Sequence, residues 1–195
     1  MSAQVRLEIQ DGIANVTIDD GKVNALSIER IGEIEAALDE AEKAGAVVIL
    51  RGRDGVLSAG FDLATFRRGL DATIEMLRTG AQLVERLLAF PRPVLTVCTG
   101  HAYPAGAFLM LAADVRLARA GDFRIGLNET AIGLTVPRFA IELARHRLTP
   151  PGFAAIQSAR MFDPEEARLL GYVDRVLDAD ALDTAARLEA ERLRG

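Results

Sequence analysis

The chain has 195 residues, half of them hydrophobic, and a net charge of −5 with both signs spread along its length. This length can bury a core within one domain, and no basic cluster marks a nucleic-acid-binding protein. Cys98 is the single cysteine, which precludes an internal disulfide, and the first ten residues lack an apolar signal core. We therefore expect a cytoplasmic protein that binds neither nucleic acids nor membranes.

The first third of the chain predicts a hairpin, a helix and a buried strand. Residues 5–18 alternate between polar and apolar around an Asp-Gly pair, which is typical of two antiparallel strands joined by a tight turn. Ser27 can cap the helix that follows, in which apolar residues recur at helical spacing. The run AVVIL at 46–50 predicts a buried strand, and residues 51–60 are expected to form a loop.

The middle of the chain is free of Asp, Glu, Lys and Arg from residue 93 to residue 113. That length could indicate a membrane span, but two prolines, two glycines and a histidine interrupt it. We therefore predict a buried strand, a loop over 98–106 and a short buried helix. A helical region with a break near residues 69–71 precedes this stretch, and Pro91 ends it.

The last third predicts mostly helices. Two further strands are expected, over VRLAR and FRIGL, before the helices begin. The later elements are helices at 137–147, 150–158 and 164–170, a short strand in VDRVL and a charged amphipathic helix to the end. Strands that alternate with helices place the chain in the α/β class. Without a linker, residues 1–195 are expected to form a single domain.

Two segments share one local pattern, in which a buried strand runs into a glycine-containing loop that opens a helix. The loops are SAGFDL and YPAGAF. Gly60 permits a sharp turn before the amide of Phe61, and Pro104 suits the first helical position before the amide of Ala105. Amides at such helix starts have no carbonyl partner in a preceding turn. Each loop alone could be a packed turn, with Asp62 as a helix cap, but together they could form an oxyanion hole.

Glu129 stands alone in an otherwise uncharged run from residue 125 to residue 137. A carboxylate in an apolar pocket acquires a raised pKa and can act as a general base. It could remove a proton from the carbon beside a carbonyl whose oxygen rests in the oxyanion hole. The alternative is a structural glutamate that is bonded to a backbone amide or an arginine.

Four segments in this order, DDGKVNAL, SAGFDL, TGHAYPAGAFLMLAADVRLA and GLNETAIGLTVP, resemble the crotonase superfamily of acyl-CoA enzymes. The resemblance implies a spiral of repeated β-β-α units with C-terminal helices, and an assembly of one trimer or a pair of trimers. It assigns the oxyanion amides to Phe61 and Ala105 and the base to Glu129. It places the CoA moiety along two segments, made of Lys22, Val23, Asn24, Ala25, Leu26, Ser58, Ala59, Gly60, Asp62 and Leu63.

The resemblance also shows a departure from the hydratases of this family, which use two glutamates. Phe108 stands at the position of one of them, and Glu129 at the other. A single base suffices for a Δ3,Δ2-enoyl-CoA isomerase, and mitochondrial isomerases carry PAG and GLNET at these places, as this chain does. We therefore expect an isomerase of fatty-acid metabolism. Two alternatives remain, namely a hydratase that recruits Asp71 or Glu75 and a non-catalytic acyl-CoA-binding protein. The helical C-terminal part is also expected to be shorter than usual for the family.

The remaining candidate residues are expected to serve the structure. His101 could line a CoA channel but is expected to pack, and His146 is expected on the surface. Cys98 ends a buried strand without a matching histidine, so we assign it to the core. Asp114 is expected to cap or pair, and Asn24 to shape its loop. No residues have metal-ligand spacing, and no nucleotide-binding motif is present, so the sequence implies no metal and no cofactor besides the CoA thioester substrate.

Overall fold

The computed structural model describes residues 4–195. Its strands are β1 (Val5–Gln10), β2 (Ile13–Ile18), β3 (Val47–Arg51), β4 (Gly55–Ser58), β5 (Val94–Cys98), β6 (Gly100–Ala102), β7 (Val115–Arg119) and β8 (Arg175–Leu177). Its helices are α1 (Ile28–Lys43), α2 (Leu63–Arg67), α3 (Leu70–Leu88), α4 (Pro104–Ala112), α5 (Arg138–Arg147), α6 (Pro150–Ala155), α7 (Pro164–Leu170) and α8 (Ala179–Arg194). Short 3₁₀ helices, η1 (Glu129–Ile132) and η2 (Ile156–Ser158), complete the described elements.

The predicted N-terminal hairpin is confirmed. Strands β1 and β2 pair antiparallel from Val5 with Ile18 to Gln10 with Ile13. Asp11 and Gly12 form the turn, and both have positive φ angles, of 51° and 73°. A two-residue turn of this kind matches the twist of the strands that it joins. The predicted cap of α1 is also present, because the Ser27 side chain accepts a hydrogen bond from the amide of Arg30.

The β-β-α repeat is the feature that organises the fold. The main sheet has the order β1-β2-β3-β5-β7-β8 and is parallel from β2 onward. In the units β3-β4-α2 and β5-β6-α4, β3 pairs with β5 in this sheet, while β4 pairs with β6 in a separate two-stranded sheet. The two units therefore stack in register. This arrangement is the predicted α/β fold of repeated β-β-α units followed by C-terminal helices.

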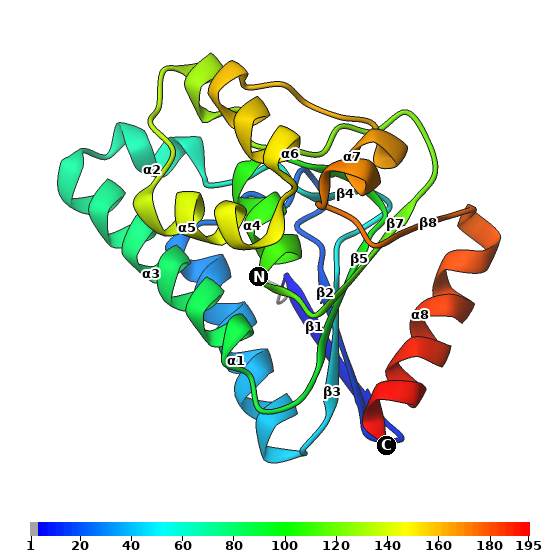
Figure 1. Cartoon of the computed structure of the whole chain (residues 1–195). Helices are drawn as coiled ribbons and strands as arrows, with labels where there is room; N and C mark the ends of the chain where they lie inside the picture. Colours follow the sequence, from blue (N-terminus) through cyan, green and yellow to red (C-terminus); the bar gives the residue numbers. More distant parts are fainter. Residues whose placement is uncertain (1–3) are drawn as a thin grey trace.

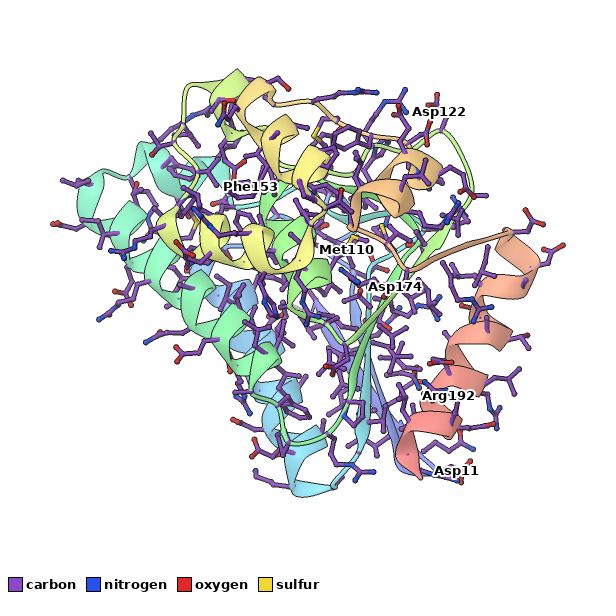
Figure 2. The ribbon with its side chains drawn as sticks, in the orientation of Figure 1. Asp11, Met110, Asp122, Phe153, Asp174 and Arg192 are labelled. Atoms are coloured by element: carbon purple, nitrogen blue, oxygen red, sulfur yellow. The ribbon has the colours of Figure 1, made fainter. Side chains whose placement is uncertain are left out.

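Helices cover both faces of the main sheet (Figure 1). Val48 and Leu50 of β3 join the core on the side of α1, α3 and α4, whereas Val47 and Ile49 face α8. Side chains alternate between the two faces of a strand, so a strand covered on both sides is apolar throughout. Met110 of α4 lies fully buried in the core on the side of α1, α3 and α4, whereas Arg192 of α8 extends to the periphery of the molecule (Figure 2).

Three sequence predictions were wrong in their details. The predicted loops over 51–60 and 98–106 contain β4 and β6, which are only four and three residues long. The predicted strand over 123–127 makes isolated bridges at Ile125 alone, and Gly126 interrupts it with a φ of +151°. Strands this short carry too few alternating residues to be recognised, and they depend on partners distant in the sequence. The uncharged stretch 93–113 forms β5, β6 and α4 as predicted, and no helix within residues 4–195 is both long and apolar enough to span a bilayer.

Candidate active site

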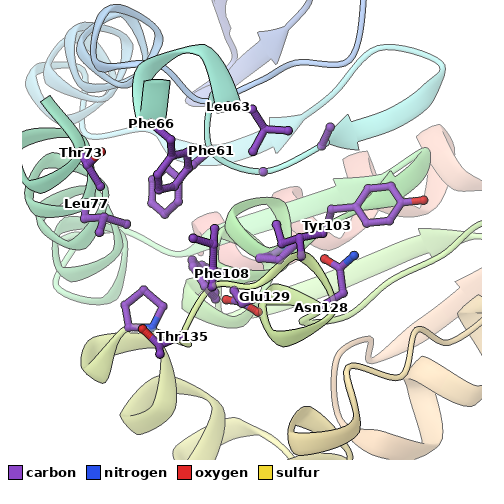
Figure 3. Close-up of a pocket in the computed structure, with 16 residues that line it drawn as sticks. Phe61, Leu63, Phe66, Thr73, Leu77, Tyr103, Phe108, Asn128, Glu129 and Thr135 are labelled. Atoms are coloured by element: carbon purple, nitrogen blue, oxygen red, sulfur yellow. The ribbon is translucent and has the colours of Figure 1, made fainter. Parts of the chain in front are cut away.

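A largely apolar cavity of about 380 Å³ lies where the two repeated loops meet η1 and the helices α2 and α3 (Figure 3). Its apolar wall includes Phe61, Phe66, Leu77, Phe108, Leu134 and Pro137. Tyr103, Asn128, Glu129 and Thr135 supply the polar lining together with Thr73. An apolar cleft with a few converging polar groups is the usual form of a small-molecule site.

The parallel pairing of β4 with β6 brings the two repeated loops into direct contact. The Tyr103 amide donates to the Ser58 carbonyl over 3.0 Å. Gly60 has a φ of +97°, and a β-carbon there would lie 3.6 Å from the amide nitrogen of Ala105. Glycine is therefore favoured at position 60 by its backbone angle, and the absence of a side chain leaves the approach between the loops open. SAGFDL and YPAGAF thus form one continuous surface beside the cavity.

The amides of Phe61 and Ala105 donate no hydrogen bond to any acceptor within residues 4–195. Phe61 lines the cavity, and Ala105 follows Pro104, which also lines it. Ala105 belongs to the first turn of α4, where amides carry the positive end of the helix dipole. Two unpaired amides on touching loops are suited to bind a carbonyl oxygen that gains negative charge.

Glu129 begins η1 and is 5% exposed. Both of its carboxylate oxygens are buried, and neither has a hydrogen-bond partner among residues 4–195. Neither an arginine nor the amide of another residue among residues 4–195 bonds this carboxylate, which disfavours the alternative of a structural glutamate. Burial raises the pKa of Glu129 above its ordinary value, because desolvation penalises the charged form. A carboxylate in this state is suited to accept a proton from a bound molecule.

Phe108 forms an apolar part of the cavity wall next to this carboxylate (Figure 3). Its ring is 1% exposed and packs against the rings of Phe61 and Phe139, with centroid distances of 6.3 and 5.4 Å. Asp71 and Glu75, the acids proposed to replace a glutamate at position 108, do not line the cavity. Asp71 is exposed, and Glu75 pairs with Arg78 over 2.6 Å. Among the described residues that line the cavity, Glu129 is the acidic one.

The two segments expected along the CoA moiety lie side by side. The Ala59 amide donates to the Val23 carbonyl over 2.9 Å, and the Leu26 amide donates to the Gly60 carbonyl over 2.8 Å. Leu26 also forms a parallel bridge with Phe61. The structure thus brings these segments together, and Ala59, Gly60 and Leu63 of the second one line the cavity, while contact of either segment with CoA stays a prediction.

The side chains of these segments divide into a buried group and an outer group. The Asn24 amide is fully buried and donates to the carbonyls of Ile18 and Leu57, so its predicted role in shaping the loop is confirmed. The hydroxyl of the buried Ser58 donates to the Asn24 carbonyl over 2.7 Å. Leu26 is buried as well, and Asp62 caps α2. The outer group comprises the exposed Lys22, Val23 and Leu63 and the half-buried Ala25 and Ala59. Gly60 is buried and lines the cavity with its backbone.

The other candidate residues have structural surroundings. Cys98 is buried in β5, and burial raises the pKa of its thiol to about 12, which leaves no nucleophilic thiolate. Asp114 accepts a hydrogen bond from the Val94 amide, His146 is exposed, and His101 stacks on Tyr103 and accepts from the Arg124 amide. These structural predictions are confirmed.

Sequence reasoning missed the walls that α2 and α3 contribute. Phe66, Thr73 and Leu77 line the cavity from these helices, and Asn128 lines it next to Glu129. Helical periodicity shows which residues share one face of α3, but it does not show that part of this face borders a cavity. Asn128 could have been selected through its place beside the lone glutamate.

Comparison with known proteins identifies relatives along nearly the whole chain. The enoyl-CoA hydratase/isomerase family model matches residues 8–195. A solved structure of an enoyl-CoA hydratase/isomerase family protein from Pseudomonas syringae is 43% identical, with a TM-score of 0.96 over 98% of this chain and 84% of that one. A probable enoyl-CoA hydratase of Bacillus subtilis is 30% identical over 96% of this chain and 75% of its own length. The mitochondrial enoyl-CoA delta isomerase 1 of Rattus norvegicus is 31% identical over 94% and 65%.

Proposed function

The chain belongs to the enoyl-CoA hydratase/isomerase family, the crotonase superfamily, and we propose that it acts as a Δ3,Δ2-enoyl-CoA isomerase. The proposed substrate is a 3-enoyl-CoA thioester, and the product is the conjugated 2-enoyl-CoA. The proposed site needs no metal and no cofactor besides the thioester itself.

One observation carries the choice of isomerisation over hydration. Glu129 is the acidic side chain among the described cavity residues, and Phe108 packs where the family's hydratases carry a second glutamate. Addition of water to a double bond is aided by two carboxylates that hold and activate the water. Transfer of a proton between two carbons of one substrate requires a single base and benefits from a site without water.

The proposed reaction proceeds in two proton transfers. Glu129 first takes a proton from C2 of the substrate, and the electrons of that bond move toward the thioester carbonyl. The enolate oxygen is held by the amides of Phe61 and Ala105, which have no competing acceptors among residues 4–195. The protonated Glu129 then returns the proton to C4, and the double bond forms between C2 and C3. Glu129 ends in its starting state, so no external acid or base is consumed.

The apolar wall supports this reaction in two ways. It raises the pKa of Glu129, so that the carboxylate is a stronger base than an exposed one. It also limits the entry of water, which would otherwise take up the proton between the two transfers. Phe61, Phe108 and Leu134 contribute to this wall.

Hydration of 2-enoyl-CoA is a second candidate, since relatives such as the Bacillus subtilis protein are named as probable hydratases. Asp71 and Glu75 lie outside the cavity wall, so a hydratase would have to work with Glu129 alone.

The test supplies the purified protein with a 3-enoyl-CoA in one cuvette and a 2-enoyl-CoA in another, and follows the absorbance of the conjugated thioester. An isomerase raises the signal in the first cuvette and leaves the second steady. A falling signal in the second cuvette would identify a hydratase. No change in either cuvette, together with binding of acyl-CoA, would identify a binding protein.

A further inference from the structure

Gly80 lies in the interior of α3, where a glycine is unfavourable by about 0.5–1 kcal/mol relative to alanine. The reason for a glycine here is the ring of Phe61. A β-carbon at position 80 would lie 2.5 Å from two carbons of that ring, far inside van der Waals contact. Gly32 in α1 differs, since a β-carbon there would meet no atom of residues 4–195 within 4 Å beyond the backbone of its own helix. The missing side chain at Gly80 therefore leaves room on the surface of α3 for the Phe61 ring, which comes from the loop before α2.

The Phe61 ring forms part of the cavity wall and is packed on two sides. It lies between α3 on one side and the Phe108 ring on the other, and it lines the cavity (Figure 3). Phe108 in turn packs edge-on against Phe139 of α5, and this contact restricts movement of the Phe108 ring away from Phe61. A ring displaced from α3 would move toward Phe108 and into the cavity. Thr73 and Leu77, which precede Gly80 on α3, form the adjacent part of the same wall.

We propose that Gly80 determines specificity: by seating the Phe61 ring against α3, it keeps open the part of the cavity that takes the acyl tail of the substrate. This inference rests on the proposed function, because it assigns the apolar space bounded by Phe61, Phe66 and Leu77 to the hydrocarbon chain of an acyl-CoA.

The test measures dissociation constants by calorimetry for saturated thioesters, with acetyl-CoA and decanoyl-CoA as probes. The variants are Gly80→Ala, Phe61→Ala with Gly80→Ala, and the matched control Gly32→Ala. Gly80→Ala should weaken decanoyl-CoA binding by about tenfold or more, because the added methyl group displaces the Phe61 ring into the space for the acyl tail. Acetyl-CoA has no such tail, so its binding should change by about twofold at most. The double variant should recover most of the loss for decanoyl-CoA, since no ring remains to be displaced. Gly32→Ala should bind both probes as the unmodified protein does.

The results that would overturn the role of Gly80 differ from those that would overturn the proposed function. Equal weakening of both probes by Gly80→Ala, or a loss that persists in the double variant, would overturn the role of Gly80. If Gly80→Ala alone does not fold, the double variant decides, because relief of the overlap must restore both folding and decanoyl-CoA binding. The probes have no double bond, so the result does not depend on isomerase activity. A protein that binds neither probe would instead refute the proposed acyl-CoA substrate.

Discussion

Gly106 of α4 lies directly against the backbone carbonyl of Ser58, since a β-carbon at position 106 would stand 2.6 Å from that oxygen. The contact sets how closely the two repeated loops approach, and with it the relation between the amides of Phe61 and Ala105. Gly106→Ala should push these loops apart and weaken the hold on the enolate oxygen. We expect kcat to fall by about 10²-fold, the effect of losing one oxyanion donor.

Steady-state kinetics beside thermal unfolding would check this prediction. Gly32→Ala is the matched control, because it introduces the same methyl group into a helix at a point where residues 4–195 leave space for it. A Gly106→Ala variant that folds normally and keeps full kcat would show that the approach of the loops does not govern the reaction.

Glu129→Gln should abolish most turnover while acyl-CoA binding persists, because glutamine has a similar shape but cannot accept the proton. The expected loss in kcat is about 10²–10⁴-fold, as for the removal of a general base. The conversion of 3-enoyl-CoA and the affinity for a saturated acyl-CoA would be measured on the same preparation. Substantial turnover by this variant would rule out Glu129 as the base.

The activity should depend on pH through Glu129. Its pKa is raised by burial, and the base must be ionised to act. We therefore expect kcat/KM to rise with pH through this elevated pKa and then level off. Burial, together with the Glu129 charge, also raises the pKa of the Tyr172 hydroxyl, which therefore stays neutral over this range. A profile that is flat across the acidic and neutral range would contradict a buried carboxylate base.

Glu129 should also make the stability of the protein depend on pH, with stability falling as the pH rises while activity increases. Folding favours the neutral form of Glu129, so its contribution is fully present below the unfolded pKa and is lost as pH rises through the elevated folded pKa. Glu129→Gln should therefore raise Tm at neutral pH, and this advantage should shrink as the pH falls toward 4.5, the ordinary value. Calorimetric scans of both proteins across this range would test the sign.

Arg116 and Asp174 form an ion pair that joins β7 to the segment before β8. The Arg116 side chain is 10% exposed, and it also donates to the Gly171 carbonyl over 2.7 Å. Asp174→Ala would leave a nearly buried guanidinium without its carboxylate, and because the Asp174 side chain is 36% exposed we expect a loss of about 1–3 kcal/mol in the free energy of unfolding. Chemical denaturation would measure this loss. The double replacement Arg116→Met and Asp174→Leu should recover part of the stability, and a failure to do so would assign the loss to packing.

Local patterns were sufficient to predict much of the fold and the centre of the site. The alternation in 5–18, the cap at Ser27 and the glycine loops before α2 and α4 each depend on neighbouring residues, so they can be recognised in a single sequence. Glu129 stands out in the sequence because a lone charge in an apolar run is itself a local feature. The four motifs that resemble the crotonase superfamily are also contiguous segments.

The tertiary structure decided what depends on contacts between distant residues. Strands β4 and β6 are too short to have a pattern of their own and exist through their pairing with each other. The same pairing brings Phe61 and Ala105 onto touching loops, and no spacing in the sequence specifies that approach. Two further features likewise depend on the tertiary structure: the Glu129 carboxylate has no hydrogen-bond partner among residues 4–195, and the Phe61 ring packs against Gly80. The sequence by itself determined which residues could do chemistry, whereas non-local packing decided which of them meet and how deeply they are buried.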